Sequence, residues 1–208
     1  MLKLLAIGDS HIPRRAKRIP DKIIEKLNQL TETELFKLTF FTGDLIQAPK
    51  FLNFLNLKTK GELLIVIGNM DHFGGNRDAP MFQKSDLTFS DKEVITIGLT
   101  HGHQISPRGD LKQLELLAIE KEFNILISGH THKEEVFLTE KGILLLNPGS
   151  VTGAWSFIAS NNPSFITLNF SLKTQEIDVN LFQLDIRSSK LNNLRSHFIF
   201  QNNRIKYK

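Results

Sequence analysis

The 208-residue sequence contains no cysteine, which excludes disulfide bonds and thiolate metal sites. Any bound metal ion must therefore be held by His, Asp, Asn or Glu. No run of about 18 apolar residues is present, so no membrane-spanning helix is expected. The N-terminal segment enters a polar motif too early to serve as a signal peptide. Together these absences favour a cytoplasmic protein.

Aromatic residues are missing from the one concentrated basic run, residues 14–18. A platform for single-stranded nucleic acid needs aromatic side chains among its cations, so nucleic acid is not an expected partner. The net charge of +4 and the pI near 9.3 fit an ordinary solvated surface. The basic run could instead contact an acidic partner or a phosphate-rich substrate.

Apolar runs alternate with amphipathic segments in the first half of the chain, whereas strand-like runs dominate the second half. This pattern predicts an α/β layered domain with two mixed β-sheets flanked by helices. The length fits a single domain over residues 1–208. Strands are expected at 2–7, 38–42, 63–67, 87–89, 94–100, 124–127, 135–138, 143–146, 165–170 and 177–184, and helices near 20–30, 50–57 and 110–123.

Two segments lack a clear pattern. Residues 72–85, which include Gly74, Gly75 and Pro80, are predicted to form a long surface loop. Residues 188–208 are expected to hold a short helix and a last strand. Trp155, Phe157 and Ile158 could form either an exposed patch or part of the core.

Polar, metal-ligating residue types recur directly after the strand-like runs. Ligands of open α/β sheets gather beyond the carboxyl ends of strands, so these side chains should meet at one edge. His130 and His132 are two residues apart and would point to the same side of extended backbone. The candidate site residues are Asp9, His11, Asp44, Asn69, His101, His103, His130 and His132.

Carboxylate, amide and imidazole ligands without thiolate suit Mn, Zn or Fe. A single carboxylate can bridge two such ions about 3.5–4 Å apart, the spacing of two-metal phosphoester sites. Two divalent ions would clamp the phosphoryl oxygens and lower the pKa of a water that attacks in line. The residue types therefore predict a site for two divalent metal ions and a possible phosphodiester substrate.

The order and spacing of these residues resemble the motif series of the calcineurin-like metallophosphoesterases. The matching motifs are Asp9-x-His11, Gly43-Asp44, Gly68-Asn69, His101-Gly102-His103 and Gly129-His130-Thr131-His132. Residues 8–13, 101–104, 125–132 and 147–154 are most similar to the branch of this superfamily that serves as a retromer subunit. The resemblance implies a layered metallophosphoesterase-like fold.

The resemblance also implies how the ligands divide between two ions. One ion would take Asp9, His11, Asp44 and His132, and the other Asp44, Asn69, His101 and His130. Asp44 would bridge the two ions, and His103 would lie at the edge of the site. In an active enzyme, Asp44 and His103 would be the catalytic residues.

Two departures from the family pattern bear on activity and on partners. Active members commonly carry His directly after the Asn, where this chain has Met70. General acid catalysis typically contributes about 10²–10⁴-fold, so slow chemistry is expected unless His72 substitutes. The retromer subunit docks its partner through residues after the His-Gly-His-Gln motif, here Ile105, Ser106 and Arg108. Polar Ser106 predicts a weaker or different interface.

Two functions follow. The first is a scaffold that holds two divalent metal ions and docks a helical-solenoid, retromer-type subunit for endosomal or vesicular protein transport. Such a protein would be cytoplasmic and could reach endosomal membranes through its partner. The alternative is a metal-dependent phosphodiesterase that uses a water activated by two metal ions.

Overall fold

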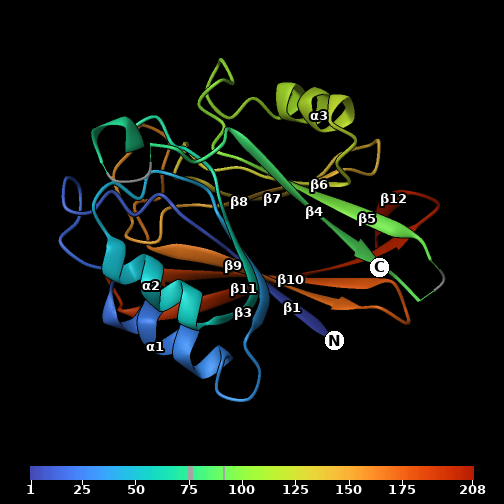
Figure 1. The fold of residues 1–208 in the computed structure, drawn as a ribbon, viewed down its shortest axis with the longest axis horizontal. Helices are drawn as coiled ribbons and strands as arrows, with labels where there is room; N and C mark the ends of the chain where they lie inside the picture. Colours follow the sequence, from blue (N-terminus) through green and yellow to red (C-terminus); the bar gives the residue numbers. More distant parts are fainter. Residues whose placement is uncertain (75–76, 91) are drawn as a thin grey trace.

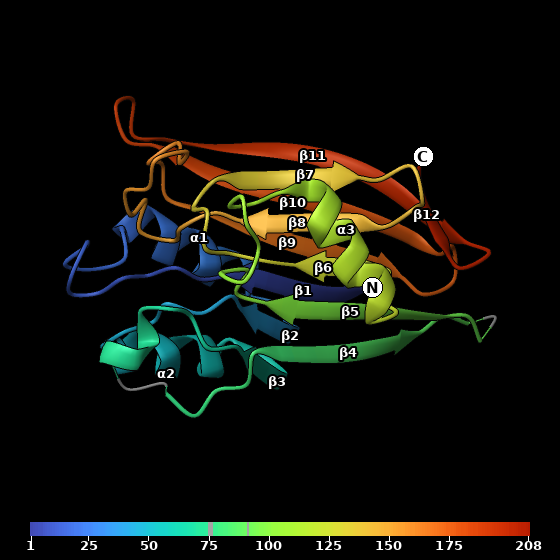
Figure 2. The same cartoon turned by 90° about the horizontal axis from the view of Figure 1, so that it is seen from above.

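Two mixed β-sheets pack face to face in the computed structural model, which describes residues 1–74, 77–90 and 92–208. Figure 1 shows helices α1 and α2 outside one sheet and helix α3 outside the other. Figure 2, turned by a quarter, shows strands of the two sheets overlying each other. The α/β layered fold predicted from the sequence is therefore confirmed.

The larger sheet combines a parallel half and an antiparallel half. Strands β1, β2 and β3 run parallel, and helices α1 (Asp21–Leu30) and α2 (Pro49–Leu57) form their crossovers. The remaining strands are antiparallel neighbours. The strand order is β12 (Arg204–Tyr207), β11 (Lys190–Gln201), β10 (Glu176–Asp185), β9 (Ser164–Ser171), β1 (Leu2–Ile7), β2 (Phe36–Phe41) and β3 (Thr59–Ile65).

The smaller sheet has a parallel centre and two antiparallel edges. Its order is β4 (Phe82–Thr88), β5 (Val94–Thr100), β6 (Ile125–Ile127), β8 (Leu144–Pro148) and β7 (Glu134–Leu138). Strands β5, β6 and β8 are parallel, whereas β4 and β7 pair antiparallel with their neighbours. Helix α3 (Leu111–Glu120) connects β5 to β6, and a short 3₁₀ helix, η1 (Asp71–Phe73), precedes β4.

Burial on both faces explains the nearly continuous aliphatic runs of the central strands. Leu4 and Ala6 of β1 point into the core between the two sheets. Leu5 and Ile7 point to the other face, where they pack with the residues of α1 and α2. Such runs are typical of strands covered on both faces. The layers thus fix the ends of β1 and of its parallel neighbours, where the candidate site residues lie.

The structure corrects the predictions for the two segments without a clear pattern. The loop expected at 72–85 is shorter, because η1 occupies its start and β4 begins at Phe82; residues 75–76 lie outside the described residues. The prediction of a short helix within residues 188–208 is wrong, because this segment forms strands β11 and β12. Both β4 and β11 carry many exposed polar residues, so neither shows the apolar alternation of a half-buried strand.

Within the described ranges, none of the helices has the length and apolar character needed to cross a membrane. The prediction of a single domain over residues 1–208 stays a prediction.

Candidate metal centre

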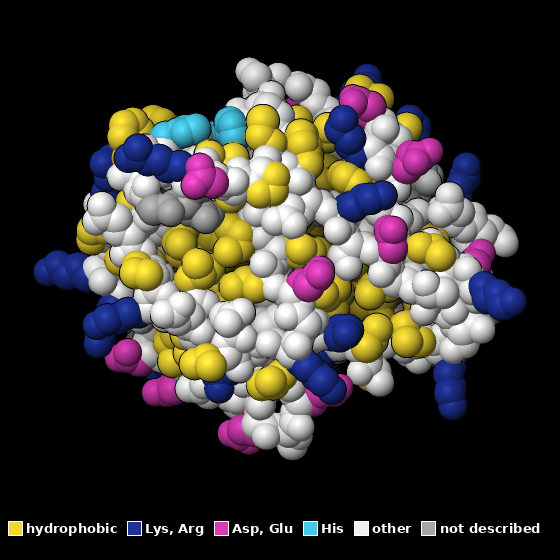
Figure 3. All heavy atoms as spheres, viewed as in Figure 1, with side chains coloured by type: hydrophobic (Ala, Val, Ile, Leu, Met, Phe, Trp, Pro, Cys, Tyr) yellow, Lys and Arg dark blue, Asp and Glu magenta, His cyan; other side chains and the backbone are white. Residues whose placement is uncertain are grey.

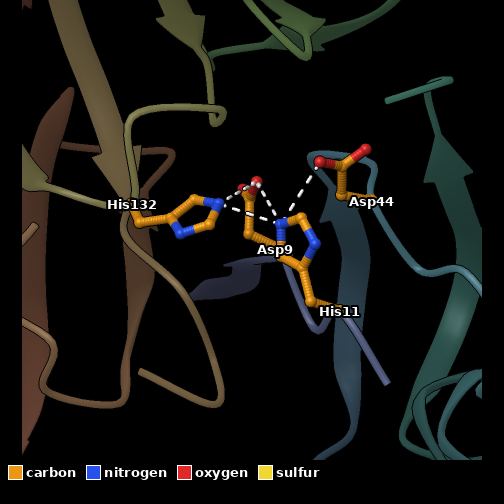
Figure 4. Close-up of side chains that lie close together, drawn as sticks. All are labelled: Asp9, His11, Asp44 and His132. Carbon is orange, nitrogen blue, oxygen red and sulfur yellow. Dashed lines mark hydrogen bonds and ion pairs between the residues drawn. The ribbon is translucent and has the colours of Figure 1, made fainter. Parts of the chain in front are cut away.

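Four buried side chains converge where β1, β2 and β6 end. Asp9, His11, Asp44 and His132 each offer one ligand atom, and these atoms all lie within 4.8 Å of one another (Figure 4). Nε2 of His11 is 3.2 Å from Oδ2 of Asp44. Nε2 of His132 is 3.3 Å from Oδ1 of Asp9. The four residues come from both sheets and surround one point.

A second group of side chains lies on the other side of Asp44. Nε2 of His101 is 3.1 Å from Oδ1 of Asn69 and 3.5 Å from Oδ2 of Asp44. The ring of His130 lies 5.0 Å, centre to centre, from that of His101, and the ring of His103 lies 5.5 Å from it. Oδ2 of Asp44 therefore faces both groups. The structure brings together all eight candidate residues, including His103 at the margin.

The turns after the strands, rather than extended backbone, aim these side chains. Asp9, His11, Asp44, His130 and His132 all have φ between 48° and 68°, the left-handed region that non-glycine residues rarely adopt. Strained backbone of this kind clusters at functional sites. The expectation that His130 and His132 share one side of extended backbone is therefore wrong, because each sits in its own left-handed turn.

Backbone carbonyls fix the tautomers of two imidazoles. Nδ1 of His101 lies 2.7 Å from the carbonyl oxygen of Thr42, and Nδ1 of His132 lies 2.8 Å from that of Ala154. Because a carbonyl oxygen can only accept, each Nδ1 must carry the hydrogen. In the neutral ring the lone pair is then on Nε2, which points into the site. This arrangement is typical of metal-binding histidines.

The donor set fits a divalent cation. Asp9, His11, Asp44 and His132 are at most 3% exposed, and the two carboxylates face imidazole nitrogens rather than lysine or arginine. Nε2 of His11 and Nε2 of His132 face each other at 2.9 Å, where an ion could take the lone pair of each. Buried charges are normally paired or bound to metal. Oxygen and nitrogen donors without sulfur suit Mn, Zn or Fe.

Burial shifts the pKa values of three groups strongly. It lowers the pKa of His11 and of His130 to about 3, and nearby positive charges, including Arg108 beside His130, add to this effect. It raises the pKa of Asp44 from 3.8 to about 6, although the charge of His101 opposes the rise. His11 and His130 are therefore neutral near pH 7, the form that binds metal.

Asp9 and His132 shift each other's pKa in the opposite sense to burial. Burial alone would raise the pKa of Asp9, but the hydrogen bond with His132 and the charges of the surrounding imidazoles hold it well below its ordinary value. Burial alone would lower the pKa of His132, but the hydrogen bond and the charge of Asp9 raise it above 6.5. Each of these two residues therefore stabilises the charged form of the other.

Asp71 is a positioning residue to which the sequence pattern assigned no role. Its carboxylate is fully buried and accepts hydrogen bonds from three backbone N–H groups, those of Asp44, Ile46 and Gly68, each at 2.9 Å. It thereby ties the turn that carries Asp44 to the turn that carries Asn69. From sequence alone, an Asp two residues after Asn69 looks like a solvated loop residue, so no signal distinguished it.

Two glycines allow the carboxylates to approach the neighbouring turns. A Cβ on Gly68 would lie 2.0 Å from Oδ1 of Asp44, and a Cβ on Gly129 would lie 2.4 Å from Oδ2 of Asp9. Both distances are far below van der Waals contact. Glycine is therefore required at both positions because a side chain has no room there. A left-handed backbone is not the reason, since neither glycine has a positive φ.

Residues 147–154 support the turn that follows β1 and carries Asp9. Ser150 Oγ donates to the carbonyl oxygen of Asp9 at 2.7 Å and accepts from the N–H of Ala154 at 2.9 Å. Ala154 in turn accepts from His132. Residues 147–154 thus support two candidate ligands, Asp9 and His132.

The rim of the site carries exposed aromatic and cationic side chains. Trp155, Phe157 and Ile158 are 56%, 87% and 47% exposed, so they form a surface patch rather than core. Arg15 donates to the carbonyl oxygen of Trp155, and Arg108 donates to Ser156. Figure 3 shows histidine side chains at the surface beside Lys or Arg and hydrophobic side chains.

The residues of the predicted partner face differ in exposure. Ser106 and Arg108 are exposed. Ile105 is only 8% exposed and packs with Leu114 and Ala118 of α3, so it offers little contact area to a partner.

The proton-donor position lies against the site. Met70 is half-buried, and its N–H donates to Oδ1 of Asp44 at 2.8 Å. His72 is exposed, close enough for its charge to lower the pKa of His103, although burial lowers that pKa more.

Residues 2–171 match the calcineurin-like phosphoesterase superfamily domain. A protein from Methanothermobacter thermautotrophicus named "probable metallophosphoesterase" is 36% identical over 148 residues, 70% of this chain and 75% of the relative. The solved structure of vacuolar protein sorting 29 (Vps29) from Cryptosporidium parvum has a TM-score of 0.81 and 30% identity, covering 95% of this chain and 98% of that one. Wild-type Vps29 from Entamoeba histolytica, solved in complex with Zn²⁺, has a TM-score of 0.76 and 29% identity over 94% and 99% of the two chains.

Proposed function

The chain belongs to the calcineurin-like phosphoesterase superfamily, and on that premise we propose that it is a Vps29-like scaffold. It binds two divalent metal ions at the strand-end site. One ion takes Asp9, His11, Asp44 and His132, and the other takes Asp44, Asn69, His101 and His130. The face around the ions docks a helical-solenoid, retromer-type subunit, through which the cytoplasmic protein reaches endosomal membranes.

The exposed patch of Trp155, Phe157 and Ile158 carries the docking proposal. A large aromatic side chain left in solvent beside a rigid site is a typical interface anchor. Trp155 and Phe157 stack edge to face with ring centres 4.8 Å apart. Arg15 donates to the carbonyl oxygen of Trp155, and Arg108 donates to the hydroxyl of the intervening residue, Ser156. Exposed Ser106 and Arg108 extend this face with polar contacts.

Binding of a helical-repeat subunit from the same organism, measured by calorimetry, tests the scaffold. We expect Trp155→Ala and Phe157→Ala each to weaken binding by about tenfold or more, as hot-spot residues do. Tyr207→Ala provides the control, because Tyr207 is an equally exposed aromatic residue, 67% exposed, on β12. Equal binding by all three variants and the unmodified protein would exclude docking through this face.

A second function, a metal-dependent phosphodiesterase, is favoured by the complete ligand set and by two arginines at the rim. Divalent ions held here would supply Lewis-acid stabilisation of phosphoryl oxygens and lower the pKa of a water. Arg15 and Arg108 lie close enough to the site to lower the pKa values of its imidazoles, so they would attract the phosphate. His103 at the margin would donate a hydrogen bond to it.

The absence of a proton donor at Met70 sets the substrates that this enzyme would cleave. A methionine side chain cannot protonate a leaving alkoxide, so hydrolysis would depend on leaving groups that need no proton. Aryl phosphodiesters meet this condition, whereas alkyl phosphodiesters do not. Slow turnover restricted to labile esters is the expected behaviour.

Incubation of Mn²⁺-loaded protein with an activated aryl phosphodiester separates the two functions. Turnover at ordinary enzyme rates, on the order of 1–10³ s⁻¹, that disappears in Asp44→Asn would reject a purely scaffolding role. Absence of turnover in protein that elemental analysis shows to hold its ions would reject the enzyme. Loading well below one ion per chain would reject the proposed ligand assignment itself.

A further inference from the structure

A groove of about 580 Å³ lies between the first turns of α1 and α2, on the outer face of the larger sheet. Its apolar floor includes Ile19, Ala48, Phe51 and Phe54. Figure 1 shows α1 and α2 side by side on that face. The volume falls within the roughly 300–1,000 Å³ that small-molecule sites occupy.

Packing against the core holds the floor in place. Ile19, Ala48 and Phe51 are at most 8% exposed and belong to the cluster under the two helices. The rings of Phe51 and Phe54 are stacked, 14° from parallel, with their centres 6.2 Å apart. The groove therefore exists before any ligand binds, and a ligand would not have to order it.

The rim of the groove is cationic. Lys17, Arg18 and Lys50 line it together with one carboxylate, Asp21, which pairs with Arg18 at 3.1 Å. Over the part of the chain that the structure describes, Lys17 and Lys50 form no ion pair with a carboxylate. The rim thus offers two uncompensated positive charges beside an apolar floor. The N-terminal turns of both helices face the same opening and add to the positive potential.

The basic run at residues 14–18 divides between two places. Arg14 lies over the ring of Phe73 at 4.9 Å, and Arg15 bonds to Trp155, both beside the candidate metal centre. Lys17 and Arg18 face the groove instead. Neither function proposed above uses this second half of the run.

We propose that the groove binds a single-chain anionic amphiphile, such as a long-chain carboxylate or an alkyl phosphate. Its head group pairs with Lys17 and Lys50, and its alkyl chain lies on Phe51 and Phe54. The apolar floor favours binding of an alkyl chain, and the unpaired positive charges at the rim favour a negatively charged head group. The inference is independent of both proposed functions, because none of the candidate metal ligands lines the groove.

Calorimetric titration of the full chain with octanoate, decanoate and laurate, each below its critical micelle concentration, tests the proposal. Affinity should rise about two- to fourfold with each added methylene, because each one is partly removed from water. Dodecyl phosphate should bind as laurate does. Dodecyltrimethylammonium, with the same chain and the opposite charge, should bind at least tenfold more weakly.

Matched variants locate the binding. Lys17→Glu combined with Lys50→Glu should weaken laurate binding about tenfold or more, whereas Lys60→Glu, an exposed lysine on β3, should leave it within twofold. Phe54→Asp should abolish binding, whereas Leu57→Asp, 74% exposed on the same helix, should not. Melting temperature and Mn²⁺ content verify that each variant is folded.

Several results would overturn the proposal. They are equal binding of the cationic amphiphile, laurate affinity unchanged by the lysine double variant, and no binding of laurate by the folded protein. Inorganic phosphate or an acidic peptide that binds as tightly as laurate would also overturn it, since neither has an alkyl chain for the floor.

Discussion

Asp71 acts on the candidate metal centre without touching the point where the ligands converge. Its two oxygens accept three backbone N–H groups, so an amide in its place must leave at least one of them without an acceptor. We expect Asp71→Asn to lower metal affinity about 10–100-fold, as loss of a supporting group typically does. It should also cost about 1–3 kcal/mol of unfolding free energy. Calorimetric Mn²⁺ titration and thermal melts measure the two effects.

The control for Asp71→Asn is Asp178→Asn. Asp178 is a partly exposed carboxylate that bonds to His197 at 2.6 Å, away from the site. This change should leave metal affinity unaltered. Equal affinity in Asp71→Asn and Asp178→Asn would show that the buried carboxylate does not position Asp44.

Met70 occupies the position from which a general acid would act. Met70→His should raise turnover of an alkyl phosphodiester by about 10²–10⁴-fold and change that of an activated aryl diester little, because only the alkoxide needs a proton. Steady-state rates on the two substrates, measured in Mn²⁺-loaded protein, test this. A uniform effect on both substrates would point to altered binding instead of proton donation.

The buried imidazoles predict how the stability of the metal-free protein depends on pH. His11 and His130 have pKa values of about 3, below the ordinary 6.5, so the unfolded chain binds more protons between these limits. Stability is therefore lost as the pH falls below about 6.5. Asp44, with its pKa raised to about 6, and His132, whose pKa is also raised, act in the opposite direction. The two imidazoles with strongly lowered pKa values should outweigh them.

Thermal melts in a chelating buffer at about pH 7 and about pH 4.5 measure this dependence. The melting temperature should be lower in acid, and His130→Gln should reduce the difference. A melting temperature that rises on acidification would contradict the assignment of neutral buried imidazoles.

At the scale of elements, two of the site turns begin with a glycine that leaves room for a neighbouring carboxylate. Gly68→Ala would place a methyl group 2.0 Å from Oδ1 of Asp44, so this carboxylate or its turn must move. We expect metal affinity to fall at least tenfold, since a shift of about 1 Å in a positioned group can cost that much. Metal content and a melt of the metal-free protein measure the change. Full metal affinity in this variant would mean that Asp44 does not hold the ion.

The strands buried on both faces could be predicted most directly. Leu2–Ile7 and Ile125–Ile127 are almost entirely aliphatic because cores lie on both sides of them. Edge strand β4 and the long strand β11 could not be predicted over their full length, because one face of each strand contacts solvent and carries polar residues. Pairing with a neighbour, which the local sequence does not encode, decides their structure.

The site residues could be predicted better than their geometry. Asp9, His11 and Asp44 follow apolar runs, and a shared sheet edge brings such residues together. The left-handed turns at these residues could not be predicted, because side chains other than glycine adopt them only when tertiary contacts compensate the strain. The role of Asp71 depends on the same contacts.

At the scale of the whole molecule, the candidate ligands come from both sheets. Asp9, His11, Asp44 and Asn69 follow strands of the larger sheet, and His101, His130 and His132 follow strands of the smaller one. Ions bound here would connect the two sheets at one end of the core. At about 100 times the dissociation constant, binding adds about 2.7 kcal/mol to the unfolding free energy.

For a chain of this length, that gain corresponds to a rise in melting temperature of about 5–10 °C. Thermal melts with Mn²⁺ or Zn²⁺ and with a chelator measure the rise. Asp44→Asn should reduce it, because this carboxylate faces both groups of ligands. An unchanged melting temperature at saturating ion concentration would show that the ions do not bind preferentially to the folded state.

The loop at residues 154–158 also gives the molecule an optical property. Trp155 is the only tryptophan in the chain, so emission excited at the red edge of its absorption comes from one indole. The carbonyl oxygen of the neighbouring Ala154 accepts a hydrogen bond from His132, and the carbonyl oxygen of Trp155 accepts one from Arg15. His132 is thus connected to the residue that carries the indole through one hydrogen bond and one peptide bond. The intrinsic fluorescence of the unlabelled protein therefore serves as a readout of events at the strand-end site.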